Sequence, residues 1–278
     1  MAERQRRTGG ALVVAGFLLC GCVGIAGCSG SGADTEDARS ADSVRTLRRA
    51  ADTLVDAGSS KARTSMEMAN GGTRVTIRGE GVYDYRRQLG RLRVLLPQDP
   101  AGVSEHRPIT ELLAPGALFM KNRGAGVPAD KWVRVDTATL SDGNLVTGGV
   151  TDPLAAAEVL RGTRTATYVG ETVLAGTAVR HYRGTADLGA AARKASAGSK
   201  GPLAAAAKGF TSAAVPFDVY LDEKGRIRKV RHRFSLVGGA PKDSVVVAST
   251  TLLYDFGTPA KVRLPAAGDI YAGRIAEE

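Results

Sequence analysis

The chain has 278 residues, a formal net charge of +10 at pH 7 and three cysteines, Cys20, Cys22 and Cys28. Because all three lie within the first 28 residues, the composition excludes disulfides, redox pairs and thiolate metal sites from the rest of the chain. The length fits one large domain or two small ones.

The start of the chain has the layout of a secretory signal. Three arginines and one glutamate lie within residues 1–7, and residues 9–26 carry no charge. In such a signal the basic start stays in the cytoplasm while the apolar run enters the bilayer. The run is nearly long enough to be a permanent membrane helix, but its glycines and its ending favour a cleaved signal.

The signal ends in Ile25-Ala26-Gly27-Cys28. An aliphatic residue, two small residues and a cysteine match the lipobox of bacterial lipoproteins. We expect residues 1–27 to be removed and Cys28 to carry a lipid that holds the protein at the outer face of the cytoplasmic membrane. Cys22 is a poor second lipobox. An uncleaved anchor and an ordinary secreted protein are the alternatives, and the general and twin-arginine export routes both stay open.

The net charge has to be interpreted in that compartment. Without the three arginines and one glutamate of the signal, the remaining 251 residues keep a charge of +8. An exported protein does not normally meet nucleic acid, so we expect no nucleic-acid partner. The charge favours anionic lipid headgroups or acidic envelope polymers as partners. A solvated basic face without a specific partner is the alternative.

A flexible tether and a helix are predicted after the signal. Residues 28–41 comprise the lipidated cysteine and a run of small and polar residues, which is typical of a tether. Asp42 or Ser43 can cap a helix whose apolar residues recur at helical spacing and which ends at Gly58. We expect residues 42–278 to form a single domain.

From Ser60 the hydrophobic period changes to two, which predicts strands. Residues 73–85 and 87–96 form an antiparallel hairpin in which apolar residues alternate with polar and charged ones, so one face is wet. Gly79 and Gly81 lie inside the first of these strands and indicate strong curvature or a bulge.

The middle of the chain is less regular. Asp152 and Pro153 predict the start of a helix, and Gly162 predicts its end. Residues 189–209 are almost wholly Ala, Gly, Ser and Lys, which favours a loosely packed insertion or a mobile lid. Further strands are predicted at residues 117–121, 131–136, 164–169 and 178–188.

Three long strands close the chain, at residues 215–221, 226–237 and 244–256, with a turn at residues 222–225. In the last of them the alternation places Leu252 and Tyr254 on the apolar face. The whole pattern predicts an α+β protein with nine to eleven antiparallel strands and three or four helices.

In the order of its motifs the sequence resembles the LppX/LprA/LprF/LprG lipoproteins of actinobacteria. Besides the lipobox, the motifs that carry the resemblance are short and follow one another through the domain. They are Gly79-Glu80-Gly81-Val82-Tyr83-Asp84-Tyr85, Lys131-Trp132-Val133-Arg134-Val135-Asp136, Val169-Gly170-Glu171, Gly176-Thr177-Ala178-Val179-Arg180-His181-Tyr182, Asp218-Val219-Tyr220-Leu221-Asp222 and Asp255-Phe256-Gly257-Thr258-Pro259-Ala260-Lys261-Val262.

The resemblance implies a strongly curved antiparallel β half-barrel with helices on its concave side, similar to the lipoprotein carriers LolA and LolB. It also implies that acyl chains of a lipid or glycolipid lie between sheet and helices. A curved apolar face has to be filled by its own helices or by a ligand, so a closed, dry core is the alternative. The residues expected to line the cavity are Val75, Ile77, Tyr83, Leu92, Val94, Phe217, Val219, Val230, Phe234, Leu252 and Tyr254.

No constellation for catalysis or metal binding is visible in the sequence. His106, His181 and His232 are far apart, and none lies in a metal-binding motif. There is no nucleophile elbow, phosphate-binding loop or dinucleotide fingerprint, and no pair of carboxylates stands out. We therefore expect a protein that is not an enzyme and that has no cofactor and no metal.

One basic cluster remains, at residues 226–233. Lys229, Arg231 and Arg233 share one face of a strand, which favours a patch for anionic headgroups, with a solvated outer face as the alternative. Two functions are then open. The chain is a lipid or glycolipid carrier at the membrane, or a non-enzymatic envelope protein with a closed core that binds a protein partner.

Overall fold

The computed structural model describes residues 31–70, 73–97, 107–124, 126–237 and 244–272. The signal segment, the lipobox with Cys28, and His106 lie outside the described residues. Within the described ranges, no helix has both the length and the apolar character needed to cross a membrane.

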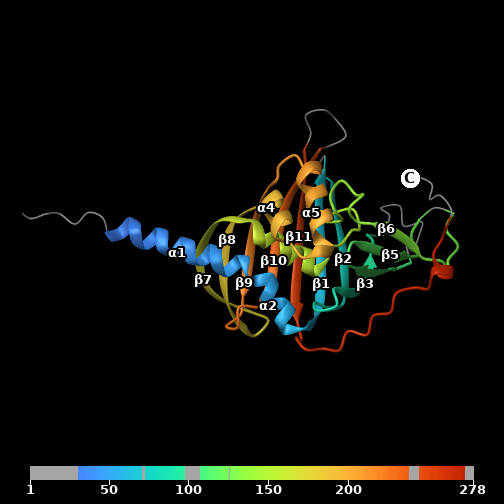
Figure 1. Cartoon of the computed structure of the whole chain (residues 1–278), viewed down its shortest axis with the longest axis horizontal. Helices are drawn as coiled ribbons and strands as arrows, with labels where there is room; N and C mark the ends of the chain where they lie inside the picture. Colours follow the sequence, from blue (N-terminus) through green and yellow to red (C-terminus); the bar gives the residue numbers. More distant parts are fainter. Residues whose placement is uncertain (1–30, 71–72, 98–106, 125, 238–243, 273–278) are drawn as a thin grey trace, which may run out of the picture.

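A single antiparallel sheet of eleven strands organises this part of the chain (Figure 1). Its order is β6-β5-β4-β3-β2-β1-β11-β10-β9-β8-β7, so β6 and β7 are its two edges and the sheet is not closed. The predicted α+β half-barrel is confirmed. The strands are β1 Ser59–Asn70, β2 Thr73–Asp84, β3 Leu89–Leu95, β4 Ile109–Ala114, β5 Ala117–Lys121, β6 Val133–Asp136, β7 Thr163–Leu174, β8 Thr177–Asp187, β9 Ala214–Leu221, β10 Ile227–Val237 and β11 Ser244–Tyr254.

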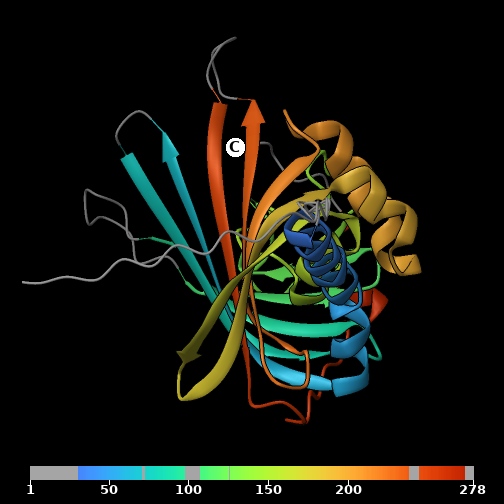
Figure 2. The same cartoon turned by 90° about the vertical axis from the view of Figure 1, so that its left-hand side faces the viewer.

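The helices lie on the concave side of the sheet, which curves around them in Figure 2. Their buried residues and those of the inner sheet face form one continuous apolar core. The helices are α1 Ser31–Arg48, α2 Ala50–Ala57, α3 Pro153–Val159, α4 Leu188–Lys194 and α5 Ala197–Gly209, with 3-10 turns at Leu160–Gly162 and Ala267–Asp269.

Helix α3 begins where the sequence predicts; it ends at Val159, and a 3-10 turn continues from it to Gly162, the predicted end. The Asp152 carboxylate accepts hydrogen bonds from the backbone amides of Leu154 and Ala155 at the first turn, which satisfies two donors that have no partner inside the helix. Just beyond α3, Arg161 pairs with Asp52 of α2 (2.6 Å) and with the buried Glu158 (2.5 Å). These charges hold α3 against α2 on the concave side.

Small residues allow the strong curvature between β2 and β3. A Cβ atom on Gly81 would lie 1.9 Å from the carbonyl oxygen of Arg91 on the neighbouring strand, and one on Gly79 would lie 2.7 Å from Val150. The pairing of β2 with β3 has no register shift. Of the two expectations for these glycines, curvature is therefore confirmed, and no bulge forms there.

The first helix starts earlier than predicted. It begins at Ser31, so residues 31–41, predicted as part of a flexible tether, are helical. Alanines and acidic residues near the helix start favour this conformation, because alanine has a high helix propensity and negative charges are attracted to the positive end of the helix dipole. Arg48 donates to the carbonyl oxygen of Thr163 at 2.7 Å and so fixes the other end of α1 to β7. The predicted helix end at Gly58, with φ of 82°, is confirmed.

The alanine-rich segment packs more closely than predicted. Ala191 of α4 and Ala206 of α5 are fully buried, and a Cβ atom on Gly209 would lie 2.0 Å from the carbonyl oxygen of Ser141. Small side chains bring backbones together, so a composition that buries little area per residue still forms a close interface. The prediction of a loosely packed insertion is wrong for α4 and α5.

The alternation assigned to the last strand is also wrong. Leu252 and Tyr254 pair with Arg63 and Lys61 on the convex face, whereas their neighbour Leu253 is buried on the concave face. The concave set includes Ser249, whose hydroxyl lies 2.5 Å from that of Thr151. The sequence pattern assigned only apolar side chains to the concave face of this strand. A hydroxyl group can be buried there because it has a hydrogen-bond partner.

Strand β4 was not predicted, because both of its faces are covered and it does not alternate. Ile109 and Leu113 face the concave core. On the convex side Leu112 packs with Phe119 under Val262, which belongs to the segment that follows the last strand. Buried strands of this kind have near-continuous apolar runs.

Replacing Gly81 with Ala should destabilise the fold by about 1–3 kcal/mol, because β2 and β3 have to separate to admit a methyl group. Urea unfolding followed by circular dichroism measures the change. Gly268→Ala is the control, since a Cβ atom there would meet nothing within 4 Å. Equal stability of the two variants would contradict this account of the curvature.

Candidate functional site

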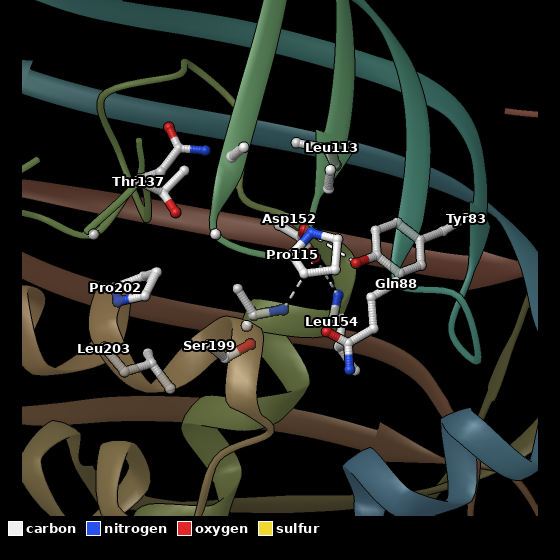
Figure 3. Close-up of a pocket in the computed structure, with 17 residues that line it drawn as sticks. Tyr83, Gln88, Leu113, Pro115, Thr137, Asp152, Leu154, Ser199, Pro202 and Leu203 are labelled. Atoms are coloured by element: carbon white, nitrogen blue, oxygen red, sulfur yellow. Dashed lines mark hydrogen bonds between the residues drawn. The ribbon is translucent and has the colours of Figure 1, made fainter. Parts of the chain in front are cut away.

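The space between the sheet and the helices is largely filled by the chain's own side chains. Tyr83, Tyr85, Phe217 and Phe234 are essentially fully buried there. A recess between β2, β4, α3 and α5 (Figure 3) holds only about 40 Å³, which is room for two or three water molecules. A recess of this size does not accommodate an acyl chain in the present conformation.

Asp152 is the titratable group of this recess. Figure 3 shows its carboxylate between the hydroxyl of Tyr83, which donates at 3.2 Å, and the backbone amide of Leu154, which donates at 2.7 Å. Burial raises the pKa of Asp152 to about 6, although the hydrogen bonds from the amides and the tyrosine favour its charged form. The Oδ1 atom of Asn144, a recess residue, has no partner among the described residues. The recess is small, and its few polar groups suit water.

A larger hollow opens on the concave face near one end of the sheet. We call this the hairpin end, because strands β1 and β10 end there and strands β2 and β11 begin there. In Figure 2 this end stands at the top. The hollow has a volume of about 560 Å³, and Ile77, Leu96, Ile109 and Val127 form its apolar wall. Arg107 and Arg123 also line it. We call it the open hollow.

Glu111 lies two residues after Ile109 on the same face of β4, where it pairs with Leu92 of β3 and Met120 of β5. It is fully buried, and neither carboxylate oxygen has a hydrogen-bond partner among the described residues. Burial raises the pKa of Glu111 to about 8, and Arg123 only partly offsets this. At neutral pH the group is an uncharged acid, so the surroundings of the open hollow carry little negative charge.

His232 is a second buried group on the concave face. It lies on β10 beside Phe234, is 1% exposed, and its Nε2 atom has no partner among the described residues. Burial lowers its pKa to about 3. The imidazole is therefore neutral across the physiological range.

The convex face carries a separate groove of about 310 Å³, which we call the convex groove. It crosses β11, β1, β2 and β3, and its side chains combine charge with aliphatic surface. The side chains on which its chemistry depends are Arg63, Arg78, Glu80, Arg93, Leu95 and Leu252.

The predicted cavity residues divide between the two faces. Nine of them lie on the concave face, and of these only Ile77 reaches the open hollow and only Tyr83 the small recess. Leu252 and Tyr254 lie on the convex face, where Leu252 lines the convex groove and Tyr254 stacks under Arg63. The nine are Val75, Ile77, Tyr83, Leu92, Val94, Phe217, Val219, Val230 and Phe234.

The predicted headgroup cluster lies on the convex side of β10, as the alternation indicated. Arg231 is 3.6 Å from Glu67, Arg233 is 3.4 Å from Asp218, and the ammonium of Lys229 lies 5.2 Å from the ring centre of Tyr220. Each of the three cations thus has a partner on another strand: Lys229 and Arg233 on the neighbouring β9, and Arg231 on β1, beyond β11.

Sequence reasoning missed most of the open hollow. Leu96 and Ile109 flank the connection between β3 and β4, and β4 itself was not predicted. Arg123 and Val127 lie in the connection from β5 to β6, for which the sequence offered no periodic signal. The apolar residues of β4 were the one available indication, although Thr110 and Glu111 interrupt the run. In the described part of the chain, no three His, Cys, Asp or Glu side chains gather as a metal site would need.

Comparisons with known proteins bear on the fold. No protein-family model matches the chain, and no curated protein matches its sequence. Among solved structures it is similar to the lipoprotein LppX of Mycobacterium tuberculosis, with a TM-score of 0.48 and 11% identity over 80% of this chain and 99% of that one. It is also similar to LprF of Mycobacterium bovis, with a TM-score of 0.41 and 14% identity over 82% and 99%.

A third similar structure is a putative outer membrane lipoprotein-sorting protein domain from Vibrio parahaemolyticus, with a TM-score of 0.31 and 10% identity over 80% of this chain and 94% of that one. LppX and LprF are two of the proteins named in the resemblance drawn from the sequence. Identities this low concern the fold alone, and TM-scores below 0.5 are too low to support a functional argument.

Replacing Glu111 with Gln should change how stability depends on pH. The folded pKa of about 8 lies above the unfolded value of 4.5, so the folded state holds the proton longer and stability falls as pH rises from about 4.5 to about 8. Glutamine lacks this penalty, so the variant should gain up to about 3 kcal/mol relative to the natural chain at pH 7. At pH 4 the two should be nearly equal.

Urea unfolding of both chains between pH 4 and pH 8.5 measures this difference. Asp152 and His232 titrate in both chains and cancel in the comparison. A difference that does not grow with pH would show that the Glu111 carboxyl is hydrated or paired in the folded state.

Proposed function

We propose that the chain is a membrane-anchored lipoprotein that binds a lipid or glycolipid through acyl chains in the open hollow. The observation that carries the proposal is the hollow itself, about 560 Å³ of open volume against the apolar wall of Ile77, Leu96, Ile109 and Val127. Ligand pockets in proteins typically measure 300–1,000 Å³ and are mostly apolar.

The chemistry of the hollow supports an amphiphile rather than a fully polar ligand. Each methylene group moved from water to such a wall contributes about 0.8 kcal/mol. Among the described residues next to the wall, the carboxyl group of Glu111 is uncharged at neutral pH because burial raises its pKa to about 8. Arg107 and Arg123, which also line the hollow, suit the polar end of the same molecule.

The proposed site is not the one that the family resemblance implies. Between sheet and helices the side chains of Tyr83, Phe217 and Phe234 take the place of a ligand. Acyl chains longer than the open hollow accommodates would have to displace side chains there, as α4 and α5 move away from the sheet. Binding of a short or single-chain lipid needs no such change.

The anchor is part of the proposal. With a lipid on Cys28 the domain stays beside the outer surface of the cytoplasmic membrane, where its ligand is concentrated. Nothing in this function requires a bond to be broken, so we propose a binding or carrier protein and not an enzyme. The alternative, an envelope protein that binds a protein partner, draws support from the filled space between sheet and helices.

Filling the open hollow should remove the ligand. In Val127→Trp the indole would occupy the volume next to Ile77, so lipid recovered with the protein from its own host should fall at least tenfold. Native mass spectrometry and solvent extraction measure this. Val173→Trp, at a position 69% exposed on β7, is the control and should keep its lipid. Absence of bound lipid from the natural chain would favour the protein-binding alternative.

Cys28→Ala should release the protein from the lipid anchor. Labelling of growing cells with an alkyne fatty acid should mark the natural chain and not this variant, because the sulfur of Cys28 is the expected attachment point. Cys22→Ala is the matched control and should keep the label. Labelling of Cys28→Ala at the normal level would contradict the assignment of the lipobox.

A further inference from the structure

We propose that the convex groove binds the phosphate groups of anionic membrane lipids, and that the convex face of the sheet rests on the bilayer through it. This site lies on the opposite face of the sheet from the open hollow. It therefore adds a membrane-contact surface to the proposed function and does not depend on acyl-chain binding.

The groove holds more positive than negative charge. Along one rung of the sheet, Arg63 of β1 pairs with Glu80 of β2, and Glu80 pairs with Arg93 of β3. Arg78 stands on the next rung beside Leu95. The groove thus contains three guanidinium groups and one carboxylate among its lining side chains.

The single carboxylate does not neutralise the groove. Its nearest approach to Arg63 is 3.9 Å, and the two side chains are 63% and 56% exposed, so the pair is weak. Arg78 and Arg93 are exposed, and neither has a carboxylate within 4 Å among the described residues. Arginine binds phosphate through two parallel N–H donors, which makes phosphate the ligand that this arrangement fits best.

Aliphatic side chains next to these arginines favour a bilayer over a dissolved anion. Leu95 is 41% exposed within the groove, and Val246, on the same convex face of β11, is 46% exposed. Surfaces that lie in a membrane interface combine basic side chains with exposed aliphatic ones. An acidic polysaccharide would satisfy the arginines but would leave Leu95 and Val246 in water.

The position of the groove gives the contact a consequence for the open hollow. Successive residues of a strand point to opposite faces, so Ile77 and Leu96 line the hollow while their neighbours Arg78 and Leu95 line the groove. The middle of β2 and the end of β3 next to it therefore form one wall with a basic outer side and an apolar inner side. A bilayer in contact with the outer side lies next to the mouth of the hollow.

Vesicle binding tests the proposal. The chain from residue 29 onward contains every element of the described structure and lacks the lipid anchor, so binding reflects the domain alone. It should sediment with vesicles of phosphatidylglycerol and phosphatidylcholine, bind pure phosphatidylcholine at least tenfold more weakly, and release at high salt. Equal binding to both vesicles, or no binding to either, would overturn the proposal.

Charge reversal locates the site. One basic side chain near an anionic surface changes affinity about fivefold, so Arg78→Glu with Arg93→Glu should weaken binding to the anionic vesicles at least about 25-fold. Arg134→Glu, at an exposed arginine on the convex face of β6, makes the same charge change per residue outside the groove and should change affinity less than fivefold. Equal losses in both proteins would indicate general attraction and no site.

A second pair of variants separates a bilayer from an acidic polymer. Leu95→Asp should weaken vesicle binding, and Val173→Asp at the far end of β7 should not. Tighter binding to polygalacturonate than to vesicles, unchanged by Leu95→Asp, would identify a polymer as the partner and refute the membrane contact. The Val127→Trp variant should lose its lipid and still bind vesicles, whereas the Arg78 and Arg93 variant should do the reverse, so the two proposals fail independently.

Discussion

An open sheet of eleven strands leaves one curved apolar face that has to be covered, and most of the structure follows from this constraint. Helices α1–α5 cover it over the middle of the sheet and toward β7, and glycines and alanines let them approach closely. β1 and β2 are each twelve residues long, and their ends run past the helices in Figure 2. The open hollow is the part of the concave face that these helices leave uncovered.

The same constraint explains what the sequence could and could not predict. Strands with one wet face, such as β2 and β3, alternate clearly and were placed correctly, as was the start of α3 at Asp152. Strand β4 was missed because the C-terminal segment around Val262 covers its outer face and removes the alternation. In β11, cationic side chains cover Tyr254 on the outside while a hydroxyl pair sits inside. Contacts between distant segments decide these positions, and local patterns do not contain them.

Two titratable groups on the concave face oppose one another in their dependence on pH. Glu111, with its pKa raised to about 8, stabilises the fold less as pH rises above 4.5. His232, with its pKa lowered to about 3, stabilises it less as pH falls below 6.5. Between pH 4.5 and 6.5 the two slopes have opposite signs and largely cancel. Taken alone, the pair gives a stability that is nearly flat in mildly acidic conditions and falls on either side.

The proposed functions of the two faces depend on one register. Shifting β3 by a single residue against β2 would turn Leu95 inward and Leu96 outward, and the basic groove and the apolar hollow would both be lost. The pairing of Gly81 with Leu92 fixes this register, because a Cβ atom at this position would lie 1.9 Å from the carbonyl oxygen of Arg91. The glycine that permits the curvature of the sheet therefore also determines which side chains line the convex groove and which line the open hollow, the two sites proposed for the bilayer and for the lipid.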